Sequence, residues 1–453
     1  MPNFSLHYGT YGTQTLTDGE SGVIGSTAVI NATNAVGVDG SSTFGGMSLA
    51  VYGAIYSTFT HGVVMSGGRQ TIFVGAQGEI QGNISGGAFY AGIVLSNAQD
   101  GSTITNAGTI NGGGQAIYFH SAATAANISV TNTGLISSVF SGILFAGGAI
   151  SAPPTASVLN AGQIVGTNTG ITSLEFTALD IINSGLLQAS GNAIAASLGT
   201  IADKVRNSGE IYGNIELYFG NDTFDNRGGT VEGSINLGDG DDTLFLGASV
   251  EVANGGAGLK DAIDVTTGAG GVIDLTDEGR GTGLALGDTL LGFERVYGSK
   301  SGVDTVYGNT ASNLIYTYGG NDVIFADLGA DAIYAGRGAD TITGGAGNDT
   351  FGYQFINEFG DTITDFSSTG SGNDDRFTFR ASNLGGGLVA GPLDPTKFQA
   401  RADNVADAND RFIFRTTDTT LWLDVDGAGG VAPVMVADLQ AGATVTAADI
   451  ILV

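Results

Sequence analysis

Six oxygen-bearing side chains in the second half of the chain recur at a constant spacing of nine residues: Asp304, Asn313, Asp322, Asp331, Asp340 and Asp349. A branched or aromatic apolar residue stands two positions after each of them, and a glycine stands two positions before each of them except Asn313. Carboxylate and amide oxygens that return in one local frame are suitable ligands for a hard metal cation. We call these six residues the acid ladder.

The elements that must position this ladder are short strands joined by tight glycine turns. Glycine adopts the positive φ angles of a tight turn and lets its carbonyl oxygen face a shared cavity. The apolar residue two positions after each acid is the inward side chain of a strand with alternating orientation. If two nine-residue units complete one coil, side chains two units apart lie above one another. The coil then has two edges, one with Asp304, Asp322 and Asp340 and the other with Asn313, Asp331 and Asp349.

Stacked carboxylates repel one another, and a cation with six or more flexible oxygen ligands relieves this repulsion. Calcium fits that description better than magnesium does. The chain has no cysteine and no histidine after His120, which argues against zinc or another soft-ligand metal. Two further acids stand in similar turns near the middle of the chain, Asp222 and Asp242. The predicted calcium ligands are Asp222, Asp242, Asp304, Asn313, Gly320, Asp322, Gly329, Asp331, Gly338, Asp340, Gly347 and Asp349.

The nine-residue unit resembles the G-G-x-G-x-D-x-U-x repeat of the RTX proteins, which are calcium-binding proteins exported from Gram-negative bacteria by type I secretion. The stretch Gly298–Asn313 is similar to the start of their β-roll, and three later stretches resemble their cap and secretion region: Asp361–Phe366, Leu421–Gly427 and Ala447–Val453. The resemblance covers roughly residues 292–453. It implies several bound Ca²⁺ ions, an extracellular or cell-surface location, and recognition by the type I secretion machinery.

A longer repeat occupies much of the first half of the chain. The pattern apolar, any, Asn, any, Gly, any, apolar returns at irregular intervals, with its asparagines at Asn106, Asn132, Asn160, Asn183, Asn207 and Asn226. A second apolar anchor follows each copy, as Ile117 follows Ile110. Repeats of this length with short alternating strands predict a parallel β-helix, in which an asparagine at a fixed corner forms an amide ladder between coils.

The predicted fold class is therefore all-β, a parallel β-helix (β-solenoid) that narrows into a calcium-binding RTX β-roll. Residues 1–235 are assigned to the β-helix with its N-terminal cap, and residues 236–300 to a transition region with early calcium turns. Residues 301–360 are assigned to the β-roll, and residues 361–453 to the C-terminal cap and secretion region.

Composition and charge exclude several functions. The chain has 453 residues, of which 77 are glycine and none is cysteine, and its formal net charge is −29. Arg69 is the only basic residue before Lys204, so the basic patches that bind nucleic acid or anionic membranes are missing. The chain has no uninterrupted apolar stretch long enough to span a membrane, and Met1–His7 lacks the features of a signal peptide. We expect no membrane insertion, and export information in the C-terminal region.

The sequence favours a non-enzymatic function. His7, His61 and His120 have no acid beside them in a recognised motif, whereas lyase or epimerase chemistry on uronates needs a cation and a base. We expect a secreted, calcium-dependent structural protein of the bacterial cell surface, a surface-layer, matrix-fibre or adhesin subunit, that folds on Ca²⁺ and self-assembles into an oligomer or polymer. Outward aromatic residues such as Tyr316 and Tyr334 could contact other copies or a surface polysaccharide. The alternative is an extracellular polysaccharide-modifying enzyme, a lyase, epimerase or hydrolase on the β-helix, with the RTX region as its export module.

Overall fold

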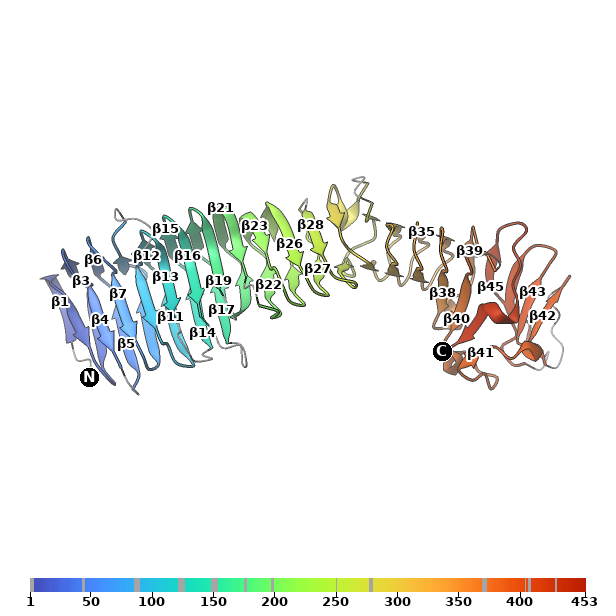
Figure 1. Cartoon of the computed structure of the whole chain (residues 1–453), viewed down its shortest axis with the longest axis horizontal. Coiled ribbons are helices and arrows are strands. Elements are labelled where there is room, and N and C mark those ends of the chain that lie inside the picture. The colour runs from blue at the N-terminus through green and yellow to red at the C-terminus, as the bar shows by residue number, and fades with distance from the viewer. Residues whose placement is uncertain are drawn as a thin grey trace. The chain divides into compact units, whose positions relative to one another are not determined.

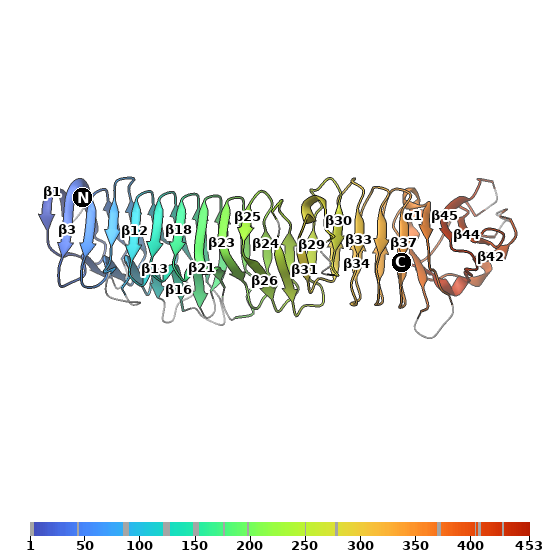
Figure 2. The ribbon, with the colours of Figure 1, turned by 90° about the horizontal axis from the view of Figure 1, so that it is seen from above.

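The computed structural model describes residues 4–42, 45–84, 90–120, 127–147, 154–174, 177–196, 199–249, 251–276, 280–368, 373–403, 405, 409–427 and 430–453. The chain divides into two compact units, unit 1 (Met1–Gly258) and unit 2 (Leu259–Val453). Both are built almost entirely from β-strands (Figure 1 and Figure 2). The division between them falls inside the predicted transition region.

Unit 1 is a parallel β-helix whose strands form three stacks, and each strand pairs with the strand one coil away. The first stack contains β5 (Met47–Val51), β8 (Gln70–Val74), β11 (Ser102–Asn106), β14 (Ile128–Asn132), β17 (Thr155–Asn160), β20 (Ala178–Asn183), β22 (Lys204–Asn207), β24 (Thr223–Asp225) and β27 (Thr243–Phe245). The second contains β6 (Ala54–Ser57), β9 (Glu79–Gln81), β12 (Thr109–Gly112), β15 (Leu135–Ser138), β18 (Gln163–Gly166), β21 (Leu186–Ala195), β23 (Glu210–Glu216) and β25 (Thr230–Glu232).

The third stack contains β4 (Val38–Ser41), β7 (Val63–Ser66), β10 (Ile93–Ser96), β13 (Gln115–His120), β16 (Ser141–Ala146), β19 (Thr169–Leu174), the later parts of β21 and β23, β26 (Ser234–Gly238) and β28 (Val252–Gly256). Three strands begin the helix: β1 (Phe4–Tyr11), β2 (Gln14–Leu16) and β3 (Ser21–Ala32). Because β28 still pairs with β26, the β-helix continues past the predicted end at residue 235.

Apolar side chains of successive coils lie in register and form the core of unit 1. Ile104, Val130, Val158 and Ile181 pair one above another and are at most 1% exposed. The predicted second anchors form another buried column that includes Ile117, Ile143, Ile171, Ile194 and Ile215. Complete burial of such a side chain contributes about 1.5 to 3 kcal/mol, so each coil is stabilised chiefly by its inward residues.

Unit 2 contains two facing stacks of shorter parallel strands. One contains β29 (Ala262–Asp264), β32 (Arg295–Tyr297), β34 (Leu314–Tyr316), β36 (Ala332–Tyr334), β38 (Thr350–Tyr353), β40 (Arg376–Phe379) and β46 (Ile450–Leu452). The other contains β30 (Val272–Asp274), β33 (Thr305–Tyr307), β35 (Val323–Phe325), β37 (Thr341–Thr343), β39 (Asp361–Ile363) and β45 (Val434–Leu439). Strand β31 (Thr289–Leu291) and a 3₁₀ turn, η1 (Gly283–Ala285), precede the regular coils.

The C-terminal part of unit 2 leaves the coil pattern. Strand β45 pairs antiparallel with β44 (Thr420–Leu423), which pairs antiparallel with β43 (Phe412–Arg415), and β42 (Phe398–Arg401) lies at the edge beside β43. The remaining elements are α1 (Ala381–Leu384), β41 (Gly391–Pro392), η2 (Ile356–Glu358), η3 (Pro395–Lys397) and η4 (Ala447–Asp449). In the described part of the chain, no helix has the length and apolar character needed to cross a membrane.

Candidate metal centre

The acid ladder lies at the turns of unit 2, immediately before the short strands. The three-residue strands β33 to β37 each bury their central residue, such as Ile324 of β35 and Ile333 of β36, and turn their other two side chains outward. The acid precedes the strand, so the alternation places it inward, at the corner of the coil. All six ladder residues are buried, with at most 2% of their surface exposed.

Each ladder residue is one rung of its edge, and from the second rung onward one carboxylate oxygen accepts a hydrogen bond from the backbone of the rung before it. The backbone N–H of Asp322 donates to Oδ1 of Asp340 at 2.7 Å, and the N–H of Asp331 donates to Oδ1 of Asp349 at 2.9 Å. The N–H groups of Asp304 and Asn313 donate in the same way to Asp322 and Asp331, at 2.8 and 2.7 Å. In each of these hydrogen bonds the donor and the acceptor are 18 residues apart. Ladder residues two units apart are therefore neighbours, which confirms that the coil has the two predicted edges.

The other oxygen, Oδ2, is buried and accepts no hydrogen bond at four consecutive rungs: Asp322, Asp331, Asp340 and Asp349. A buried carboxylate without compensation is costly. Burial accordingly raises the pKa of Asp322 and of Asp331 to about 7, and it raises the pKa values of Asp340 and Asp349 as well. These orphaned oxygens are what a bound cation would satisfy.

The glycine turns leave no room for a side chain next to these oxygens. A Cβ on Gly344 would lie 2.6 Å from Oδ2 of Asp349, and a Cβ on Gly347 would lie 1.4 Å from the carbonyl oxygen of Gly329. Gly347 also has a φ of 151°, which only glycine adopts readily. The predicted residues Gly320, Gly329, Gly338 and Gly347 therefore bring backbone carbonyls of adjacent coils close together, beside the carboxylates.

The donor set of these turns fits calcium. Within the described residues, no three acidic or histidine side chains converge on one point. Each turn instead combines a ladder carboxylate with neutral carbonyl oxygens, a mixed set of hard ligands that suits the flexible coordination of Ca²⁺. The residues that would hold the ions are the ladder acids and the turn glycines through their carbonyls. Bound calcium would supply positive charge to the buried carboxylates.

The first rung of each edge differs from the others. Oδ2 of Asp304 accepts the N–H of Ser299 at 2.8 Å, and Oδ1 accepts the N–H of Gly271 at 3.1 Å. The amide of Asn313 accepts the N–H of Asn309 at 2.9 Å and donates back to the Asn309 side chain at 3.1 Å. Protein groups satisfy both first rungs, so the uncompensated charge begins at the second rung.

The structure adds two rungs that the nine-residue spacing missed. The N–H of Asp340 donates to Oδ1 of Asp361 at 3.1 Å, and the N–H of Asp349 donates to Oδ1 of Asp375 at 3.0 Å. Burial and then the charge of Asp340 raise the pKa of Asp361 to about 8. The intervals grow to 21 and 26 residues at these rungs. The local frame persists, because Ile363 and Phe377 stand two positions after the acids, and this frame could have revealed them.

Unit 1 contains an acid column of its own. Asp222 and Asp242, predicted from their turns, are joined by a hydrogen bond of 2.6 Å from the N–H of Asp222 to Oδ1 of Asp242. Asp203, which we had not predicted, belongs to the same column, since its N–H donates to Oδ1 of Asp222 at 2.7 Å. Burial raises the pKa of Asp203 to about 7 and that of Asp222 to about 8.

The predicted asparagine ladder also occurs in unit 1, and it needs no ion. Each Nδ2 donates to Oδ1 of the next asparagine at 2.7 to 2.8 Å, along Asn106, Asn132, Asn160, Asn183, Asn207 and Asn226. An amide both donates and accepts, so a column of amides satisfies itself. A carboxylate only accepts, and a column of carboxylates therefore keeps unsatisfied oxygens.

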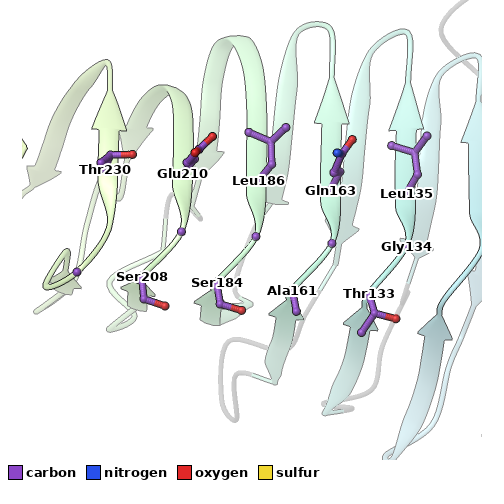
Figure 3. A pocket seen from close by; sticks show the side chains of 14 residues that line it. Thr133, Gly134, Leu135, Ala161, Gln163, Ser184, Leu186, Ser208, Glu210 and Thr230 are labelled. Carbon is purple, nitrogen blue, oxygen red and sulfur yellow. The ribbon is translucent and has the colours of Figure 1, made fainter.

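An open groove of about 860 Å³ runs across several coils of unit 1 (Figure 3). Its floor is formed by glycines of the asparagine motif, and its two walls are formed by rows of side chains that include Thr133, Ala161, Ser184 and Ser208 on one side and Leu135, Gln163, Leu186, Glu210 and Thr230 on the other. Glu210 is the only ionisable side chain among these lining residues. The groove therefore has no pair of acids and no cationic group for polysaccharide chemistry.

The outward aromatic residues three positions after the ladder acids form two stacked columns. The rings of Tyr316 and Tyr334 are stacked with centroids 4.6 Å apart, and those of Tyr307 and Phe325 are 5.2 Å apart. Tyr297 extends the first column, 5.9 Å from Tyr316. Neighbouring rings in a column cover each other's faces, so the stacked region offers ring edges and hydroxyl groups to a partner.

Comparison with known proteins supports the calcium assignment. Residues 300–333 and 327–352 match the family model of the RTX calcium-binding nonapeptide repeat, with four copies. No curated protein matches the chain. The repeat match includes the whole acid ladder but neither the acid column of unit 1 nor Asp361 and Asp375. The β-roll of unit 2 thus carries RTX repeats, which bind multiple Ca²⁺ ions.

Proposed function

We propose that this protein is a secreted structural subunit of a bacterial cell surface, which folds when it binds calcium and then self-assembles. The observation that carries this proposal is the series of buried, orphaned carboxylate oxygens in unit 2. Without a cation these groups oppose folding, and with one they join successive coils. A surface layer, a matrix fibre and an adhesin are the assemblies that such a rigid subunit suits.

Calcium dependence fits export in an unfolded state. RTX proteins are secreted by Gram-negative bacteria, and the type I secretion machinery would be a transient partner of this chain. With a formal net charge of −29, the chain repels itself when little calcium is present. Calcium outside the cell would neutralise the ladder and drive folding there.

Assembly is proposed to use the strands at the edges of the sheets. Among the described residues, β1 pairs only with β3, and β42 pairs only with β43. An edge strand presents unpaired N–H and C=O groups that can join a further strand. Tyr8 in β1 is 77% exposed, so its side chain is largely open to solvent. A second copy of the chain is the proposed partner of β1.

The enzyme alternative has less support. Polysaccharide lyases, epimerases and hydrolases need charged groups that converge on the substrate. The groove of unit 1 is lined mainly by glycine and by small or neutral side chains, with Glu210 as its one acid. A surface polysaccharide as a binding partner stays a prediction, and the edges and hydroxyls of the tyrosine column in unit 2 are the groups that would contact it.

The proposal is tested by imaging and sedimentation of the full-length protein with calcium and with a chelator. Calcium is expected to give folded protein and ordered polymers, and the chelator is expected to disperse them. Tyr8→Lys, which places a charge on the edge strand, should reduce assembly while calcium-induced folding is retained. Tyr52→Lys is the matched control, because Tyr52 is exposed but lies outside the edge strands. A dilute monomer under both conditions would contradict the structural function.

A further inference from the structure

The turns at 218–222 and 238–242 of unit 1 repeat the backbone conformation of the RTX turns at 318–322 and 336–340 of unit 2. Tyr218 and Tyr318 both have left-handed φ angles, 66° and 62°. The glycines that precede the acids by two positions match as well: φ is 147° and 155° at Gly220 and Gly320, and 146° and 145° at Gly240 and Gly338. Equivalent turn residues are 20 residues apart in unit 1 and 18 residues apart in unit 2, so the extra residues of the longer coil lie outside the turns.

The hydrogen bonds of the two turn pairs also correspond. The N–H of Gly220 donates to the carbonyl of Asp239 at 2.9 Å, and the N–H of Gly320 donates to that of Arg337 at 2.9 Å. The side chains of Asn221 and Asn321 each accept a backbone N–H from the next coil at 3.0 Å. A Cβ on Gly240 would lie 1.5 Å from the carbonyl oxygen of Gly220, and a Cβ on Gly338 would lie 1.5 Å from the carbonyl oxygen of Gly320.

An orphaned oxygen points independently to a ligand at this place. Asp222 is 1% exposed, and its Oδ2 is buried and accepts no hydrogen bond. Oδ2 of Asp203, one coil earlier, is in the same state. The arginines of the adjoining strands contact other acids, since Arg206 lies 3.6 Å from Asp180, and Arg227 lies 2.6 Å from Asp225.

The same strands show that the acids are not needed for coil stacking alone. Strand β22 is preceded by Asp203 and ends at Asn207, and β24 is preceded by Asp222 and followed by Asn226. At the end of each strand where the asparagine stands, the side-chain amides of successive coils hydrogen-bond to one another, so this corner of the coil needs no ion. An amide column at the other end would do the same. The carboxylates placed there instead introduce negative charge that the protein itself leaves uncompensated.

We propose that unit 1 holds a calcium site of its own between the turns 218–222 and 238–242. The carboxylate of Asp222 is its charged ligand, and carbonyl oxygens of the two glycine turns complete the set of hard donors. The site makes the last coils of the β-helix calcium-dependent. The earlier coils, which the asparagine ladder and the apolar columns hold together, fold without the ion. This inference goes beyond the proposed function, which requires calcium only in the RTX region.

Hydrogen–deuterium exchange of the full-length protein tests the site, with peptides from 215–245 compared with peptides from 100–147 and 300–352. A free calcium concentration ten times the dissociation constant should slow exchange in 215–245 by about tenfold. Exchange in 100–147 should not change. Magnesium at the same concentration should have little effect, because it needs a more rigid octahedral site.

Two variants assign the effect to the site. Asp222→Asn keeps Oδ1 as an acceptor and removes the charge, so it should abolish the calcium effect in 215–245, retain it in 300–352, and lower the calcium bound per chain by about one ion. Asp239→Asn, which removes an exposed charge from the same turn, should behave like the wild type.

Each other outcome has a definite meaning. If calcium slows exchange in 300–352 but not in 215–245 of the wild-type protein, the unit 1 site is refuted and the proposed function stands. If calcium affects neither region, the proposed function fails as well. A calcium effect in 215–245 that persists in Asp222→Asn also refutes the site, because that effect would then come from folding of unit 2. If the variant does not fold, the absence of a calcium effect in 215–245 of the wild-type protein still refutes the site.

Discussion

Replacement of Asp331 by asparagine should change the stability of unit 2 in opposite directions with and without calcium. Asp331 is 1% exposed, its Oδ1 accepts the N–H of Asn313, and its Oδ2 has no partner. The amide of Asp331→Asn has the same shape and keeps an oxygen for the Asn313 N–H. It carries no charge, and the chain already tolerates an amide at the Asn313 rung of this edge.

The magnitude follows from the pKa of Asp331. Burial raises this pKa from 3.8 to about 7, so ionisation at pH 7.5 opposes folding of the calcium-free protein by up to about 4 kcal/mol. Screening by the solvent around this surface turn lowers the penalty, and we expect the variant to gain about 2 to 4 kcal/mol without calcium. With calcium, loss of the charged ligand should abolish binding of the ion, and at a free calcium concentration a thousand or more times the dissociation constant the lost stabilisation is about 4 kcal/mol or more, which exceeds this gain.

Urea denaturation measures both effects, with fluorescence of the single tryptophan, Trp422, and far-ultraviolet circular dichroism as probes. The variant is expected to unfold at a higher urea concentration than the wild type in calcium-free buffer at pH 7.5, and at a lower one in saturating calcium. Asp438→Asn is the control, because Asp438 is exposed in β45 and lies outside the ladder turns. Destabilisation of the calcium-free protein by Asp331→Asn would refute the argument, because the carboxylate would then stabilise the fold without a metal.

Between pH 5.5 and 7.5, the free energy of unfolding of the calcium-free wild-type protein should fall by about 2 kcal/mol for each carboxylate with a folded pKa of about 7, such as Asp322. The reason is that the unfolded chain releases these protons near pH 3.8. Stability that rises with pH in urea titrations would contradict this. Asn160→Ala should lower the free energy of unfolding by about 3 kcal/mol, because it removes hydrogen bonds to Asn132, Asn183 and Leu186. Asn160→Asp should be destabilised at neutral pH and recover stability in acid, where its protonated carboxyl can donate a hydrogen bond. Equal stability of Asn160→Asp at neutral and acidic pH would count against the ladder. Tyr316→Ser should lower the free energy of unfolding of the calcium-loaded protein by about 1 to 3 kcal/mol, because the ring stacks on Tyr297 and Tyr334. An unchanged melting temperature would show that this tyrosine column does not contribute to stability.

The sequence predicted most of the β-roll because its spacing follows from geometry. A three-residue strand and a glycine turn repeat every nine residues, so Asp322 and Asp340 had to lie on one edge and Asp331 and Asp349 on the other. The hydrogen bonds between successive rungs confirm this arrangement. Asp361 and Asp375 were missed because insertions lengthen the last coils, although the strand register continues through β39 and β40.

The β-helix was predicted in the same way, from the return of Asn and of apolar anchors. Its variable coil length hid Asp203, the first residue of the acid column, since Asp203 and Asp222 are 19 residues apart and have different residues before them. The predicted end of the β-helix at residue 235 was also based on the change of repeat. Strand β28 shows that parallel pairing continues beyond that point.

By itself, the sequence determined the periods, the inward residues and the kind of oxygen at each corner, because strand alternation and glycine turns depend on neighbouring residues. Only the tertiary structure decided which polar atoms are satisfied. The amides of Asn160 and Asn183 satisfy each other, protein donors satisfy Asp304, and one oxygen of Asp222 or Asp331 is left without a partner. The physical reason is that hydrogen bonding at a corner depends on groups a whole coil away, and the number of residues in a coil varies along the chain.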